Sequence, residues 1–122
     1  MTLHSDTQLY AAVVELCKFV ARTVRHVRRD LKPLYGLFLV QESTWMAVLV
    51  RRANVAHGAA KAQPLTEILE QVESVQFILR LLRDLNDLPQ KAWTESVPLT
   101  TSVAKQATAL RNHFVPAAPP VS

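Results

Sequence analysis

The chain has 122 residues, with 14 lysines and arginines against 10 aspartates and glutamates, and its net charge of +4 is mildly basic. This length fits one domain that can hold a hydrophobic core without covalent staples. Its only glycines, Gly36 and Gly58, are too few for the tight turns of a β-sandwich or barrel, so we expect an all-α fold.

The first predicted helix covers residues 7–29, where apolar residues recur every three or four positions. These residues are Leu9, Val13, Leu16, Val20, Val24 and Val27. Asp6 is the expected N-cap. Pro33 should end the segment, because a proline disfavours helix at the residue before it, Lys32.

The second predicted helix covers residues 33–57, with Pro33 at its first position and Gly58 as its stop. One face carries Leu34, Phe38, Trp45, Leu49, Arg52 and Ala56, and we expect this face to point to the core. Arg52 is unusual there. It either extends its charged end to water or meets a carboxylate across an interface.

The third predicted helix covers residues 64–85, and its apolar stripe is Leu65, Ile68, Val72, Val75 and Leu79. Arg80 with Asp84, and Arg83 with Asp87, have the spacing of ion pairs along a helix.

The fourth predicted helix covers residues 89–114, with Val103, Ala107, Leu110 and Phe114 on one face. Pro98 predicts either a kink or a later start near Leu99. Four helices with short links favour an antiparallel up-down four-helix bundle over residues 1–114. Residues 115–122 hold three prolines and are expected to form a flexible tail.

The second and third helices carry more apolar surface than one stripe requires. The surplus residues are Leu39, Val40, Ala47, Val50, Phe77, Ile78, Leu81 and Leu85. A helix that is apolar all round is buried all round, and one chain of this size has too little protein to cover both faces. We therefore expect a homo-oligomer with these residues at the subunit interface. The alternative is a slightly rotated bundle that hides them within one subunit.

The sequence lacks the patterns of familiar catalytic and metal sites. No glutamate is followed three residues later by histidine, as in di-metal bundles, and the four histidines have no zinc spacing. No Gly-rich phosphate loop or G-x-S-x-G motif occurs. Cys17 lies beside the apolar face of its helix and is expected to be a small core residue. We expect no enzyme activity, metal, cofactor or small-molecule substrate.

A basic stripe follows the first helix on the side opposite its apolar face. Lys18, Arg22, Arg25 and Arg29 recur at one-turn intervals, and Arg28 and Lys32 extend the charge. Their spacing of about 5–6 Å is close to that of successive backbone phosphates, and arginine offers forked donors to phosphate oxygens. The alternative is an ordinary solvated helix face. No base-reading motif accompanies the stripe.

The end of the second predicted helix carries the segment Arg51-Arg52-Ala53-Asn54-Val55-Ala56-His57-Gly58, followed by Lys61. It resembles the R-R-A...S-N-I-A-E-G...R segment of a bacterial four-helix-bundle family that is encoded in intervening sequences of ribosomal RNA genes. The segments Arg28-Arg29-Asp30-Leu31-Lys32-Pro33 and Leu79-Arg80-Leu81-Leu82-Arg83-Asp84-Leu85 look like its Avd branch, the accessory variability determinants of diversity-generating retroelements.

This resemblance implies a pentameric barrel with a basic surface that binds nucleic acid and a reverse transcriptase without catalysis. The basic residues that match this role in residue type are those of the first helix together with Arg51, Arg52 and Lys61, and all of them are candidate nucleic-acid contacts. The sequence departs from the branch at Pro98 and near the end of the fourth helix.

The expected location is the cytoplasm. No signal peptide is apparent at the N-terminus, and no run of about 18 apolar residues lacks charge, so no membrane contact is expected. Two interpretations of function remain. The first is a basic accessory protein that binds RNA or DNA, with a reverse transcriptase as a possible partner. The second is an oligomeric protein-interaction scaffold that does not touch nucleic acid.

Overall fold

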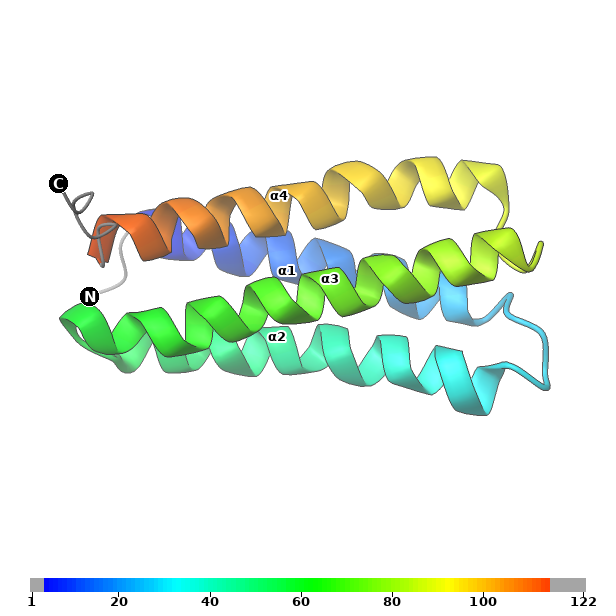
Figure 1. The fold of residues 1–122 in the computed structure, drawn as a ribbon, viewed down its shortest axis with the longest axis horizontal. Helices are drawn as coiled ribbons and strands as arrows, with labels where there is room; N and C mark the ends of the chain where they lie inside the picture. The colour runs from blue at the N-terminus through cyan, green and yellow to red at the C-terminus, as the bar shows by residue number, and fades with distance from the viewer. Residues whose placement is uncertain (1–3, 115–122) are drawn as a thin grey trace, which may run out of the picture.

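The computed structural model describes residues 4–114, which fold into long α-helices joined by short links (Figure 1). The long helices are α1 (His4–Val24), α2 (Leu37–Val55), α3 (Ala62–Asp84) and α4 (Gln90–Phe114). A π-helical turn, η1 (Lys32–Gly36), leads into α2, and a 3-10 turn, η2 (Gly58–Lys61), leads into α3. Residues 4–114 contain no strand, so the all-helical prediction is confirmed. The predicted tail, residues 115–122, lies outside the described residues.

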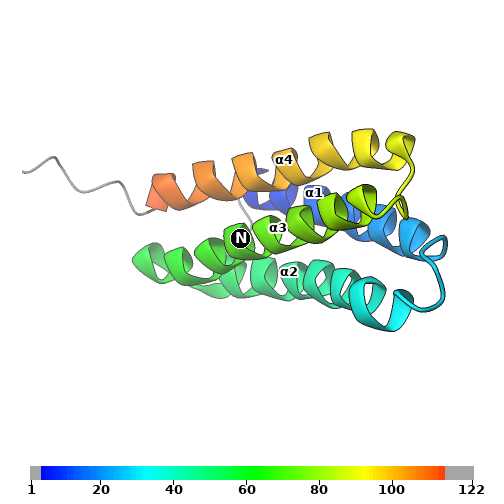
Figure 2. The same cartoon turned by 45° about the vertical axis from the view of Figure 1, so that its right-hand side comes forward.

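The four helices pack side by side in a ring. α1 and α3 each contact both α2 and α4, and Figures 1 and 2 agree on this arrangement. The α1–α2 and α3–α4 links lie at one end of the molecule, and the α2–α3 link lies at the other (Figure 1). We call the end that carries residues 25–31 and 85–89 the loop end.

The apolar stripes predicted for α1, α3 and α4 form the core. Fully buried residues include Leu9, Val13, Leu16 and Val20 of α1, Leu65, Ile68, Val72, Val75 and Leu79 of α3, and Val103, Ala107 and Leu110 of α4. Burying a side chain of this kind contributes roughly 1.5–3 kcal/mol to the free energy of unfolding. The 3.6-residue period therefore selects the correct face on these helices.

The predicted core-facing stripe of α2 is right at Leu49, which is buried, and wrong at Trp45 and Arg52, which are exposed. Trp45 and Arg52 lie on the outside, with the Arg52 guanidinium 4.8 Å from the centre of the Trp45 ring. The face toward the core instead carries Leu39, Ser43, Met46, Leu49, Val50 and Ala53. Because α2 is apolar nearly all round, its periodicity does not single out one face.

Two helix boundaries differ from prediction. α1 ends at Val24 rather than near residue 29, and it begins at His4, so Asp6 lies inside the helix instead of capping it. α4 begins at Gln90 and runs without a break through Pro98, which excludes a start near Leu99.

Gly36 lies buried where η1 passes the end of α1. A Cβ atom there would stand 2.9 Å from Cγ1 of Val24, closer than real side chains approach each other. The backbone dihedrals of Gly36 are those of an ordinary right-handed helix. Glycine is therefore needed for close approach and not for an unusual conformation.

Among the described residues, the 24-residue stretch Lys32–Val55 is long and apolar enough to cross a membrane by length and composition. One such helix is weak evidence for a membrane span, because the core helix of a soluble bundle meets the same criterion. In this fold the stretch packs against α1 and α3.

Candidate nucleic-acid interface

The predicted basic residues around the end of α1 are all exposed. Between residues 22 and 32 the chain carries five cations, and Asp30 is the one acidic residue among them, which leaves a local charge of +4. That value equals the net charge of the whole chain. The five cations are Arg22, Arg25, Arg28, Arg29 and Lys32. The basic character of the protein is therefore concentrated at the loop end.

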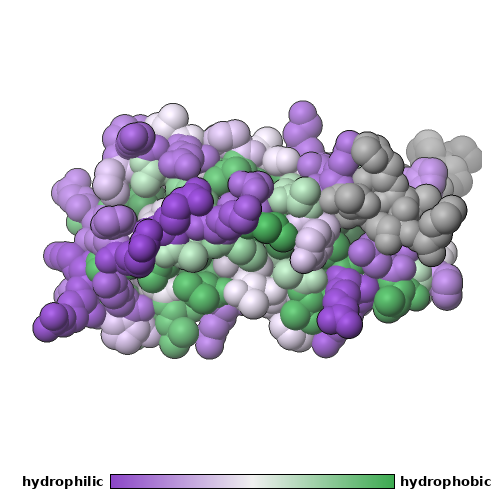
Figure 3. Space-filling view, turned by 180° about the vertical axis from the view of Figure 1, so that it is seen from behind, coloured by the Kyte–Doolittle hydropathy of each residue, from purple (hydrophilic) through white to green (hydrophobic). Residues whose placement is uncertain are grey.

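The straight helical stripe predicted for these residues does not form. Because α1 ends at Val24, Arg25, Arg28 and Arg29 belong to a segment of turns, and Lys32 begins η1. Only Lys18 and Arg22 keep helical spacing. Figure 3, which views the molecule from behind, shows hydrophilic side chains crowded at its left-hand side, where the loop end lies. The result is a basic cluster at one end of the bundle.

Some of these cations are paired with carboxylates. Lys18 lies 3.2 Å from Glu15, and Arg22 lies 3.8 Å from Glu95 of α4. Both pairs are more than half exposed, and pairs of this kind contribute about 0–1 kcal/mol, so a phosphate group can displace the carboxylate at little cost. Arg25, Arg29 and Lys32 have no side-chain partner within residues 4–114.

Arg28 has a structural role in addition to its charge. Its backbone N–H donates to the Asp87 carboxylate at 3.0 Å, and its Nε lies 3.6 Å from the same carboxylate. The Asp87 side chain is only 7 % exposed. This contact joins the α1–α2 link to the α3–α4 link and fixes the basic segment against the bundle.

The two ion pairs predicted along α3 are absent among the described residues. Asp87 contacts Arg28, whereas Arg83 contacts Asp84 at 3.2 Å and stacks on the ring of Trp93 at 4.4 Å. The Arg28–Asp87 contact spans 59 positions of sequence, and no local spacing rule reveals it.

Lys61, which was predicted to contact nucleic acid, is buried and cannot do so. The residue is only 7 % exposed, and its ammonium group donates to the backbone carbonyl of Ala53 at 2.6 Å. The same group lies 5.1 Å from the centre of the Phe114 ring. A lysine held in this way cannot reach a phosphate backbone. Arg51 and Arg52 remain exposed, but they lie on α2 away from the loop end.

The predicted oligomer interface also needs correction. Leu39, Val50 and Ile78 are buried in the core of the single chain and are not available to a second subunit. This agrees with the rotated-bundle alternative. Val40, Phe77 and Leu85 are exposed as predicted, and Ala47 and Leu81 are half-buried.

Several apolar residues that were not predicted to lie at a subunit interface are also exposed. They are Leu37, Trp45, Val48 and Val55 of α2. Together with Val40 they form what we call the outer face of α2. In Figure 3 hydrophobic side chains gather along the lower edge of the molecule, where α2 lies. An exposed apolar face of this kind is typical of a protein contact surface.

Cys17 is not an activated nucleophile. Burial raises the pKa of its thiol above the ordinary value, and a hydrogen bond with Ser43 opposes this by less. The thiol donates to the Ser43 carbonyl at 3.2 Å. No group of three or more histidine, cysteine, aspartate or glutamate side chains among the described residues is arranged to hold a metal ion.

No known protein family, curated protein or solved structure matches the chain. Its function is therefore inferred from its own surface: a basic loop end and an apolar outer face on α2.

Proposed function

We propose that the protein is a non-enzymatic accessory protein that binds nucleic acid through its phosphates, with the loop end as its contact surface. The observation that carries this proposal is the exposed cluster from Arg22 to Lys32, which holds the whole net charge of the chain. Arg25, Arg29 and Lys32 are free of carboxylate partners among the described residues, so they can pair with phosphates without first losing a contact.

The resemblance to the Avd branch supports a particular class of partner. Arg28-Arg29-Asp30-Leu31-Lys32-Pro33, the segment similar to the Avd branch, is also the segment that builds the basic loop end. Gly36, the glycine that follows it, supports the close approach of η1 to α1. We propose on this basis that the RNA or DNA is bound in the service of a reverse transcriptase of a diversity-generating retroelement.

The proposed working form is a homo-oligomer of antiparallel up-down bundles. The outer face of α2, centred on Val40, Trp45 and Val48, is the surface that supports assembly, and Phe77 of α3 is a further exposed apolar residue. The resemblance favours five subunits. A ring would repeat the loop-end cluster on each subunit, and several weak attachments then bind together much more tightly than one.

A pair of charge-reversal variants tests the nucleic-acid proposal. Arg25→Glu with Arg29→Glu reverses charge in the loop-end cluster. Arg80→Glu with Lys105→Glu makes the same change in net charge at exposed cations outside the cluster, on α3 and α4. None of the four side chains has a partner within residues 4–114.

Fluorescence anisotropy with structured RNA and duplex DNA should show that the first variant loses most binding and the second keeps most of it. Equal losses would mean that only net charge matters, and the loop end would then not be the contact surface. Circular dichroism on both variants checks that the fold is unchanged.

A second candidate function is a protein-interaction scaffold that never contacts nucleic acid. The specific observation that favours it is the exposure of Trp45 and Val48, which form an apolar surface larger than a solvated helix needs. A protein that assembles through this face yet fails to bind RNA and DNA at low salt would establish the scaffold in place of the first proposal.

A further inference from the structure

The outer face of α2 adjoins an unpaired cation near the α2–α3 link. Val48 and Arg51 line one open groove there, together with Val55. Residues 43–55 contain two arginines and no acidic residue, and Arg51 has no side-chain partner within residues 4–114. Val40 is exposed on the same face, nearer the loop end. A surface that covers this face must therefore offer a carboxylate near the link and an apolar side chain farther from it.

The exposed side of α3 carries these complementary groups. Residues 62–77 contain three glutamates and no cation. Glu70 and Glu73 are exposed, and neither carboxylate has a partner among the described residues. Phe77, one turn further along, is 60 % exposed. We call Glu70, Glu73 and Phe77 the acidic face of α3.

The two faces belong to different sides of one chain. In Figure 1 α3 passes in front of α1, whereas Figure 3 views the molecule from behind and shows hydrophobic side chains along α2. Arg51 and Glu70 form no ion pair with each other within the chain. Each face is therefore free to meet the other face of a second copy.

The apolar parts of the two faces lie at equal height along the bundle. α2 ends and α3 begins at the α2–α3 link. Val40 lies 15 positions before the end of α2, and Phe77 lies 15 positions after the start of α3. At about 1.5 Å per residue, both are roughly 22 Å from the link.

The charged parts differ slightly in height, and the direction of the side chains closes the difference. Arg51 lies 4 positions and Glu70 lies 8 positions from the link end of its helix, so their backbones are about 6 Å apart in height. A side chain on an α-helix leans toward the N-terminus of its helix. Since α2 starts at the loop end and α3 starts at the link, Arg51 leans toward the loop end and Glu70 leans toward the link. The two side chains thus reach toward the same height.

We propose that the outer face of α2 in one copy of the chain packs against the acidic face of α3 in a second copy. The inference rests on the proposed assembly through α2 and names the surface that covers it. This head-to-tail contact uses a different face on each copy, so it can continue around a closed ring. Rotation alone relates the copies in a ring, so residues of equal height meet when the bundles stand upright. Val40 then meets Phe77, and Arg51 meets Glu70.

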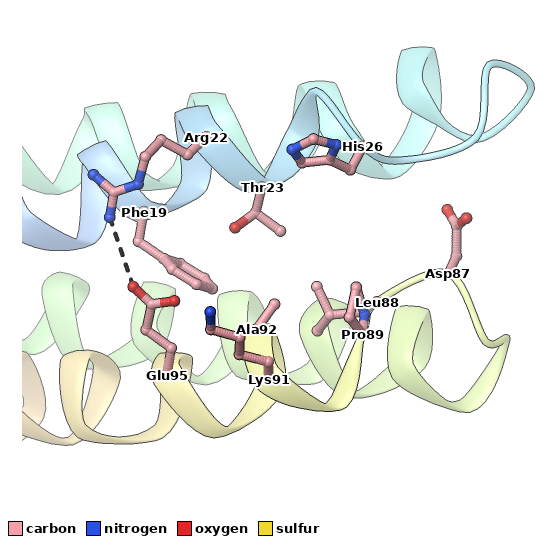
Figure 4. Close-up of a pocket in the computed structure, with 10 residues that line it drawn as sticks. All are labelled: Phe19, Arg22, Thr23, His26, Asp87, Leu88, Pro89, Lys91, Ala92 and Glu95. Carbon is pink, nitrogen blue, oxygen red and sulfur yellow. Dashed lines mark ion pairs between the residues drawn. The ribbon is translucent and has the colours of Figure 1, made fainter.

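The contact also determines where the basic clusters lie in the assembly. All copies point the same way in a head-to-tail ring, so every loop end lies on the same rim. Figure 4 shows the loop end of one copy, where Arg22 and His26 line a cavity and Arg22 reaches Glu95 of α4 at 3.8 Å. A long nucleic acid can contact several such ends at once.

Two charge reversals test the contact, one on each face. Arg51→Glu and Glu70→Arg each place like charges together, so each should raise the dissociation constant of the assembly about tenfold or more in sedimentation experiments. The double variant, and an equal mixture of the two single variants, restore opposite charges and should associate again. Asp84→Arg is the control, because Asp84 is an exposed acid of the same helix 14 positions beyond Glu70. It should leave the assembly unchanged.

A disulfide tests the register. Val40→Cys with Phe77→Cys, combined with Cys17→Ala to remove the native thiol, should give a ladder of cross-linked dimers, trimers and larger species with oxidised glutathione. Val40→Cys with Leu85→Cys is the control. Leu85 lies 8 positions beyond Phe77, about 12 Å away in height and beyond the reach of a disulfide. Circular dichroism on each variant checks that the fold is unchanged.

Several results would overturn the contact. They are an assembly that resists both reversals, an assembly that responds to Arg51→Glu and not to Glu70→Arg, and equal ladders from the two cysteine pairs. If the unmutated protein still assembles and binds RNA in these cases, only this inference fails and the proposed function stands. A monomeric unmutated protein would overturn both the contact and the proposed assembly.

Discussion

The ammonium group of Lys61 donates a 2.6 Å hydrogen bond to the carbonyl of Ala53, in the last turn of α2. The last four carbonyls of a helix lack partners within the helix, and Lys61 supplies one of them. The same ammonium lies over the ring of Phe114 in α4. One side chain thus ties the α2–α3 link to two helices, and this explains why a lysine is buried at this end of the bundle.

Replacing Lys61 should lower stability without affecting nucleic-acid binding. Lys61→Met keeps the length and apolar body of the side chain and removes the charge-assisted hydrogen bond, so we expect a loss of about 1.5–3 kcal/mol in the free energy of unfolding. Urea denaturation followed by circular dichroism measures it, and Lys105→Met is the exposed control. An unchanged free energy of unfolding would show that the Lys61–Ala53 bond contributes nothing.

Gly36→Ala should be destabilising because its new Cβ would collide with Val24. Replacing a helical glycine by alanine normally raises the free energy of unfolding by roughly 0.5–1 kcal/mol. A lower free energy of unfolding for Gly36→Ala would therefore be due to the steric conflict with Val24. Val24→Ala removes the colliding Cγ1 atom and should restore the gain. The test is a double-mutant cycle of unfolding free energies. If the effects of the two substitutions simply add, the close approach is not the reason for the glycine.

The two faces of α2 should respond differently to charge. Trp45→Glu lies on the outer face, so we expect a folded protein with a smaller assembly. Val50→Asp places a charge in the core and should unfold the chain, because an unpaired buried charge is strongly unfavourable. Val97→Glu, at an exposed apolar residue of α4, is the control and should leave the assembly intact.

Light scattering on a sizing column measures the molar mass of the assembly, and circular dichroism measures the helix content of each variant. A monomeric unmutated protein at tens of micromolar would contradict the proposed role of the outer face.

The sequence was sufficient for the general architecture and for the core of three helices. Val13 and Val103 each lie on a single apolar stripe, and such a stripe has one stable orientation in a bundle. α2 has no such stripe. Trp45 and Leu39 both look like core residues by type, so the residue pattern alone does not decide which of them turns inward.

The candidate site was less predictable for reasons that sequence spacing cannot capture. The basic residues themselves were identified, but the end of α1 at Val24 changes their arrangement from a stripe to a cluster. Asp87 reaches Arg28 across 59 positions. The burial of Lys61 was missed because lysine is rarely buried.

Cys17 should react slowly with alkylating reagents. Burial raises the pKa of its thiol, so less thiolate is present at pH 8 than in a free cysteine, and the reactive form is the thiolate. The folded state favours the protonated thiol, so this group's contribution to stability is present at neutral pH and is lost as pH rises above about 9. Labelling with iodoacetamide in native and denaturing buffer measures the difference. Equal rates in the two buffers would contradict the buried, hydrogen-bonded thiol.

The most direct measurement is the affinity of the unmutated protein for structured RNA and duplex DNA as a function of salt. Phosphate contacts release counterions, so the logarithm of the binding constant should fall linearly with the logarithm of salt concentration, by roughly 0.9 for each phosphate contacted on duplex DNA. The Arg25→Glu, Arg29→Glu variant should bind more weakly and show a shallower slope. Absence of binding at low salt, or an affinity that does not change with salt, would contradict the proposal that the loop end holds a phosphate backbone.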